Sequence, residues 1–215
     1  MKPSIIASEL RIHAPFTAFG TVTGIVIMAA FIQFHVPWEI SSALFWTLHP
    51  LHVLVSALVT TSIYRSYSQD NILRVIIIGY VGSIGIATLS DSLLPFVGEW
   101  LLDLPHRGVH LGFIEKWWLV NPLALAGIAL GYITSHTKIP HAGHVLLSTW
   151  ASLFHVLMAL GTSLDVVTTI LIAVFLFLAV WVPCCTSDIV FPLLWVKKGN
   201  GNHEHPHSVT DGGPS

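Results

Sequence analysis

The chain has 215 residues, of which 53% are hydrophobic and only 9% are charged, and its net charge at neutral pH is −2. Soluble domains carry about 25% charged residues, so this composition excludes an ordinary soluble domain. The mean hydropathy is +0.75, and several segments approach the roughly 20 apolar residues that cross a bilayer as one helix. No basic patch indicates nucleic-acid binding. The composition therefore predicts an all-α membrane protein whose first partner is the lipid bilayer.

The predicted transmembrane helices are six apolar segments, at residues 14–33, 40–64, 72–90, 119–135, 140–161 and 166–184. Short apolar tails follow the third and the sixth segment, at residues 91–102 and 187–196. The last residues, 201–215, are polar and contain several glycines, prolines and histidines. We expect this tail to be disordered, because it has too little apolar surface to bury.

Lysine and arginine positions predict how these segments are oriented. If the N-terminus is cytoplasmic, seven of the nine basic residues fall on the cytoplasmic side, and only Arg107 and Lys116 fall outside. Cytoplasmic loops of membrane proteins carry such an excess of lysine and arginine. We therefore expect a multi-pass protein of the cell membrane with both termini in the cytoplasm.

Four sequence features occur in the same order in both halves of the chain. They are a proline followed by a GxxxG pair, the phrase HxxHxxxS, a Ser-x-Asp before the third span and a Ser-Asp-x-x-x-Pro after it. In the first half they lie at residues 15–24, 49–56, 68–70 and 90–95, and in the second half at 122–131, 141–148, 163–165 and 187–192. GxxxG pairs permit close packing of membrane helices.

These matches predict two repeats of three helices each, at residues 1–102 and 103–200, with the polar tail after them. Because three is an odd number, the second repeat must enter the membrane from the opposite side. The expected architecture is a membrane helix bundle of six transmembrane helices arranged as two inverted repeats. Inverted repeats are common in transporters, which bind their substrates at the repeat interface.

The phrase HxxHxxxS predicts a metal half-site in each repeat. Its two histidines and its serine share one face of a helix, because they lie at positions i, i+3 and i+7. The third span of each repeat ends in an aspartate on the same membrane side. Two imidazoles and a carboxylate are a common ligand set for divalent Zn, Fe or Mn, and the serine would support them. The two predicted ligand sets are His49, His52 and Asp91, and His141, His144 and Asp188.

The inverted arrangement places these two half-sites in opposite leaflets of the membrane. Three more histidines are candidate ligands: His106 and His110, which could share a helix face, and His155, which lies on nearly the same face as His144. The adjacent cysteines at 184 and 185 lie close to the second half-site, but we interpret them as small buried hydrophobic residues rather than soft ligands.

A structural interpretation of the same residues stays open. Histidines near helix ends can contact lipid headgroups or backbone carbonyls, and Ser-Asp followed by proline can be a turn that ends a helix. The segment HRGVH at residues 106–110 resembles, over five residues, the histidine-rich motif of membrane-bound metal-dependent hydrolases. It lacks the threonine of that motif and its usual pair of aspartates. The resemblance implies an enzyme.

Three functions are consistent with the sequence. The first, which we favour, is a metal-ion permease that moves a divalent transition metal between the two half-sites. The second is a membrane-embedded metal-dependent enzyme, either a hydrolase or an oxidoreductase. The third is an electron-transfer subunit in which histidines ligate haem b. The chain could act as a homo-oligomer or as a subunit of a larger membrane complex. No Walker or GxSxG motif indicates ATP-driven or serine-hydrolase chemistry.

Overall fold

A computed structural model describes residues 3–68, 71–134, 138–160 and 165–196 of the chain, and it describes no side chains at 3–9, 12–13, 138–142, 185–190 and 193. Every regular element in these ranges is helical. The helices are α1 (Pro3–Gln33), α2 (Trp38–Tyr67), α3 (Ile72–Thr88), η1 (Leu89–Leu93), α4 (Leu94–Leu101), α5 (Gly112–Glu115), α6 (Trp117–Ile133), α7 (Lys138–Ala159) and α8 (Val166–Leu194).

Four of the six predicted spans coincide with helical stretches that are long and apolar enough to cross a membrane. These stretches are Ala14–Gln33, Trp38–Tyr67, Ile72–Leu101 and Val166–Cys184. The other two predicted spans correspond to shorter apolar helices, Trp117–Ile133 and Gly143–Ala159. Helix α6, with its 17 residues, is about 25 Å long, which is somewhat less than the roughly 30 Å of a bilayer core. The number of six spans therefore stays a prediction.

The distribution of polar and apolar side chains also fits a membrane environment. Val22, Val26, Ile77 and Val81 are more than half exposed, whereas several histidines and two carboxylates are buried. A soluble protein does not expose extended apolar faces of this kind. Lipid can cover the aliphatic surface, and the polar side chains then face one another inside the bundle.

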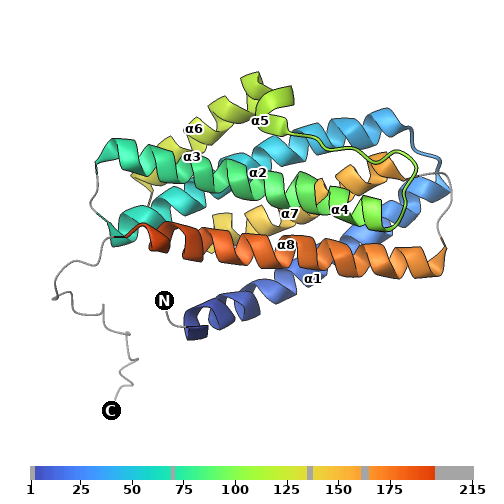
Figure 1. Cartoon of the computed structure of the whole chain (residues 1–215), viewed down its shortest axis with the longest axis horizontal. Helices are drawn as coiled ribbons and strands as arrows, with labels where there is room; N and C mark the ends of the chain where they lie inside the picture. Colours follow the sequence, from blue (N-terminus) through green and yellow to red (C-terminus); the bar gives the residue numbers. More distant parts are fainter. Residues whose placement is uncertain (1–2, 69–70, 135–137, 161–164, 197–215) are drawn as a thin grey trace, which may run out of the picture.

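The long helices alternate in direction along the chain, and α2 lies at the centre of the bundle (Figure 1). Helix α2 packs against α3, α6, α7 and α8, whereas α1 packs against α7 and α8. We call the end where α1 meets α2 the first end of the bundle. Residues 102–111 run back from this end as an irregular segment before α5 and α6 begin.

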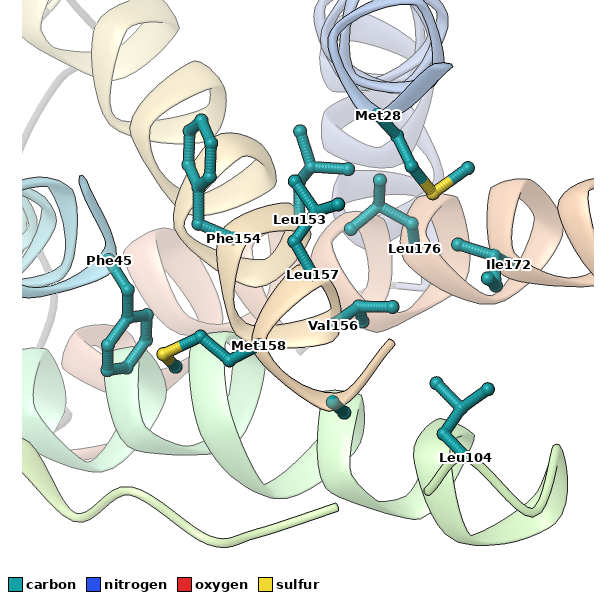
Figure 2. Close-up of a cluster of buried hydrophobic side chains, with 11 residues drawn as sticks. Met28, Phe45, Leu104, Leu153, Phe154, Val156, Leu157, Met158, Ile172 and Leu176 are labelled. Carbon is teal, nitrogen blue, oxygen red and sulfur yellow. The ribbon is translucent and has the colours of Figure 1, made fainter. Parts of the chain in front are cut away.

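An apolar core near the first end joins α7 to its neighbours. Figure 2 shows α7 side chains in contact range of side chains from α1, α2 and α8. The buried members of this core are Met28, Phe45, Leu104, Leu153, Phe154, Val156, Leu157, Met158, Ala159, Ile172 and Leu176. Their packing fixes α7 against the other helices, and α7 carries two of the predicted histidine ligands whose side chains are described.

The two predicted GxxxG pairs make reciprocal contacts. A Cβ at Gly20 would lie 3.0 Å from the Thr149 side chain on α7, and one at Gly24 would lie 3.5 Å from Leu153. In the other half, a Cβ at Gly127 or Gly131 would collide with backbone carbonyls of α2. Each glycine pair therefore packs against the histidine-bearing helix of the other half of the chain, as expected for glycines that allow close approach.

The third span does not end at Ser90 and Asp91, as the turn interpretation proposed, and residues 91–102 are not a separate tail. The helix continues from α3 through the π-helical turn η1 into α4. The N–H of Leu94 donates to the carbonyl of Leu89, five residues back, and Pro95 has no N–H to donate to the carbonyl of Ser90. The hydroxyl of Ser152 on α7 donates to that carbonyl instead, at 2.9 Å. The proline thus widens the helix without ending it.

Glycine 127 offers a test of the close packing between α6 and α2. The Gly127→Ala variant should be less stable by about 1–3 kcal/mol, because its methyl group collides with a backbone carbonyl that cannot rotate away. Gly85→Ala is the matched control, since nothing lies within 4 Å of a Cβ at that glycine. Thermal unfolding in detergent measures both. Equal stability of the two variants would contradict the packing.

The orientation and the crossing by α6 can be tested by cysteine labelling. In a background with serine at 184 and 185, we expect Val109→Cys to react with an impermeant maleimide in intact cells. Thr134→Cys should react only after the membrane is opened, because α6 separates the two positions. Both residues are exposed. Labelling of both from one side would show that α6 does not cross the membrane.

Candidate metal centre

The carboxylate of Asp91 lies buried in the middle of the bundle and is surrounded by hydrogen-bond donors. Its Oδ2 lies 3.0 Å from Nδ1 of His49 and 2.7 Å from Nδ1 of His52. Its Oδ1 accepts from the hydroxyls of Ser90 at 2.7 Å and Ser148 at 2.8 Å. Four donors suit an ionised carboxylate, which accepts hydrogen bonds and donates none. The donors come from α2, η1 and α7.

A group of potential metal ligands lies beside this carboxylate. His52 on α2, His144 on α7 and Cys184 on α8 are all buried, and their ligand atoms lie within 4.8 Å of one another. The rings of His52 and His144 stack with their centroids 5.5 Å apart. The thiol of Cys184 lies 3.5 Å from the hydroxyl of Ser148, which also contacts Asp91. This buried group of two histidines and one cysteine could hold a metal ion.

Asp91 fixes the ring orientation of His52. Because Nδ1 of His52 donates to the carboxylate, the neutral ring carries its lone pair on Nε2. Within the described part of the chain, that Nε2 atom is buried and has no hydrogen-bond partner. Metal-binding histidines usually hold a carboxylate or carbonyl at the other ring nitrogen. We predicted Asp91 as a ligand, and this stays a prediction. Its carboxylate contacts Nδ1 of His52, on the side of the ring away from Nε2.

The charges of this group are balanced when a divalent metal is bound. A divalent ion contributes +2, and the Asp91 carboxylate and a Cys184 thiolate contribute −1 each, so the sum is zero while the two histidines stay neutral. Uncompensated charge inside a membrane is costly, and a metal-bound cysteine is deprotonated. The donor set therefore fits a divalent transition metal that accepts nitrogen and sulfur ligands.

The predicted separation of His52 from His144 is wrong. The stacked rings of His52 and His144 bring both helices to one site. The reason lies in the helix lengths: His52 is the fifteenth of the 30 residues of α2, about 21 Å from its start. The phrase HPLHVLVS therefore lies near the middle of a long helix, where an antiparallel helix meets it at the same depth.

The remaining candidate ligands are distributed over several places. Nδ1 of His49 contacts Asp91, but His49 is not part of the group formed by His52, His144 and Cys184. Its Nε2 atom lies against Gly112. The side chains of His141 and Asp188 lie outside the part that the structure describes. His106 and His110 do not share a helix face, because Pro105 and Gly108 lie in an irregular segment.

His155 forms a second buried pair, with Glu99 of α4. Nδ1 of His155 lies 2.6 Å from Oε1 of Glu99, and both side chains are at most 1% exposed. The backbone N–H of Gly108 donates to the other carboxylate oxygen at 3.3 Å. Our sequence interpretation named His155 but did not include Glu99 in any site, although a carboxylate in the apolar stretch LLPFVGEWLL is an indication of function. It also favoured a structural role for Cys184, which the structure places beside two histidines.

Replacing Asp91 tests its supporting role. Asp91→Asn should weaken metal binding by about 10- to 100-fold, the loss usually seen when a carboxylate behind a histidine ligand is removed. The control is Asp103→Asn, since Asp103 is an exposed carboxylate that pairs with Arg107 at 2.8 Å. Metal titration monitored by elemental analysis measures both. Unchanged affinity in Asp91→Asn would remove Asp91 from the site.

The described side chains of the site come from α2, η1, α7 and α8, so the centre joins distant parts of the chain. Comparison with protein-family models, with curated proteins and with solved structures finds no match to this chain. The function is therefore argued from the positions and the chemistry of these side chains.

Proposed function

We propose that this chain is an integral membrane protein that carries a divalent transition metal across the bilayer, that is, a metal-ion permease. The observation that carries the proposal is the buried group of His52, His144 and Cys184. The first ligand belongs to residues 1–102, and the other two belong to residues 103–200. A site shared between two halves changes its geometry when the halves move relative to each other, as alternating access requires.

The packing supports the two inverted repeats on which this proposal depends. Gly20 and Gly127 occupy the same place in the two predicted repeats, and so do Thr149 and Ala57. Gly20 contacts Thr149, and Gly127 contacts Ala57. Corresponding glycines thus contact corresponding positions on the histidine-bearing helix of the other half. A pseudo-twofold axis in the membrane plane would produce this pattern.

The donor set narrows the choice of metal. Imidazole and thiolate ligands suit Zn²⁺ and Fe²⁺, whereas Mn²⁺ prefers carboxylate, carbonyl and water oxygens. Of the metals predicted from the sequence, Zn²⁺ and Fe²⁺ therefore fit better than Mn²⁺. Three protein ligands also leave a coordination position open for water or for an incoming ligand, which suits an ion that must later leave the site.

Haem b fits this group less well than a metal ion. The Sγ atom of Cys184 lies within 4.8 Å of the ligand atoms of both His52 and His144. A macrocycle held between the two histidines would need the space that this thiol occupies.

A metal-dependent enzyme is the second candidate function, and one observation favours it. A pocket of about 710 Å³ near the first end of the bundle is lined by His106, Arg107 and His110, among others. A pocket that leads toward buried histidines from one end suits a substrate that approaches from one side of the membrane. A carrier needs access to the metal from both sides of the membrane, whereas an enzyme needs access from one side only.

Metal flux into proteoliposomes separates these two functions. His52→Ala and His144→Ala should each abolish flux of Zn²⁺ or Fe²⁺, because each removes a ligand of the single shared site. His35→Asn is the control: His35 is exposed, and asparagine tolerates its positive φ of 51°. It should leave flux unchanged.

The alternative outcomes are distinct. Wild-type flux no greater than that of empty liposomes, together with bound metal and a hydrolytic or redox activity that His52→Ala abolishes, would establish the enzyme and refute the carrier. Flux that persists in either ligand variant would also refute it.

A further inference from the structure

The wall of the pocket near the first end contains a second arrangement of histidines held by carboxylates. His110 lines this pocket of about 710 Å³, together with His35, His106 and Arg107. Its ring lies 5.3 Å from the ring of the buried His155, at 67°. His155 is thus separated from the pocket by little more than the His110 side chain.

Both histidines have a carboxylate at Nδ1. Nδ1 of His155 lies 2.6 Å from Glu99, and Nδ1 of His110 lies 3.3 Å from Glu115. In each ring the lone pair of the neutral form therefore lies on Nε2. His52 is held by Asp91 in the same way. A carboxylate at one ring nitrogen is the usual partner of a metal-binding histidine.

Ser92 connects the two histidines. Its hydroxyl accepts a hydrogen bond from the backbone N–H of His110 at 3.0 Å and lies 3.4 Å from Nε2 of His155. The contact to His155 is long for a hydrogen bond, so a metal at Nε2 would displace a weak partner. Ser92 also lies next to Asp91 in η1, so the same helical turn contributes to both groups.

We propose that His110 and His155 form a second binding site for a divalent transition metal, with Glu99 and Glu115 as positioning residues. Two imidazoles leave several coordination positions open toward the pocket, and water can fill them. The site suits Zn²⁺, Co²⁺ and related ions that accept imidazole. It rests on the proposed function in one respect: it is the place where an ion from the pocket binds before it reaches His52, His144 and Cys184.

Phe45 lies between His155 and His49, and His49 shares Asp91 with His52. The Phe45 ring stacks on His49 at 5.4 Å and meets the edge of His155 at 5.3 Å. An ion at the outer site therefore faces an apolar ring on its way to the central group. The two sites share no ligand, so they should be filled and lost independently.

Titration of the purified full chain with Co²⁺ tests the second site. A cobalt–thiolate bond gives an intense charge-transfer absorption, and imidazole-only coordination does not. Wild type should bind two equivalents, one of them with thiolate absorption. His110→Ala and His155→Ala should each bind one equivalent and keep that absorption. His52→Ala should lose the absorption and keep one equivalent. His35→Asn, in the same pocket, should behave as wild type.

A wild type that binds one equivalent with thiolate absorption, unchanged in His110→Ala and His155→Ala, would overturn the second site and leave the central one. Loss of one equivalent in His110→Ala, with no thiolate absorption in any variant, would support the second site and refute the central one. His110 lies in an irregular segment and is partly exposed, so its variant decides the outcome if His155→Ala fails to fold.

Discussion

The carboxylate of Asp91 and its four donors form the interaction on which the rest of the centre depends. An ionised group inside an apolar bundle is tolerated only when it is paired or hydrogen-bonded. Here the donors belong to α2, η1 and α7, so satisfying one charge fixes three helical segments relative to one another. The same contacts set the ring orientation of His52. One carboxylate therefore determines both the packing of the three helical segments and the orientation of the His52 ring.

A second carboxylate repeats this arrangement closer to the end of the bundle. Glu99 lies eight residues after Asp91 on the same helical rod, and it holds His155 as Asp91 holds His52. Phe45 contacts His49, which shares Asp91 with His52, and also contacts His155. The polar interior is therefore a series of carboxylate–imidazole pairs interrupted by one aromatic ring, within a bundle whose outer face is aliphatic.

Sequence patterns predicted the helical class, and they grouped His49 and His52 with Asp91, which contacts both histidines in the structure. Helical periodicity placed the two histidines on one face, and the ligand role of the three residues stays a prediction. They did not predict the depth at which α2 and α7 meet, which depends on helix length and crossing geometry. The alternative interpretation of Ser90 and Asp91 as a turn that ends the helix does not hold, because the helix widens at residues 89–93 and continues into α4. Cys184 was undervalued, because its chemistry depends on neighbours more than 30 residues away. The six-span count and the symmetry of the repeats stay predictions.

The π-helical turn at residues 89–93 makes the position of Asp91 depend on chain length as well as on residue identity. A π turn accommodates one more residue than a regular helix between the same two flanks. Deleting a single residue there would let α3 and α4 join as one regular helix, with both flanks still packed. The carboxylate, however, would rotate by up to about 100° around the helix axis. An insertion or deletion in this segment would therefore move the Asp91 carboxylate away from the histidines, although every side chain of the centre is retained.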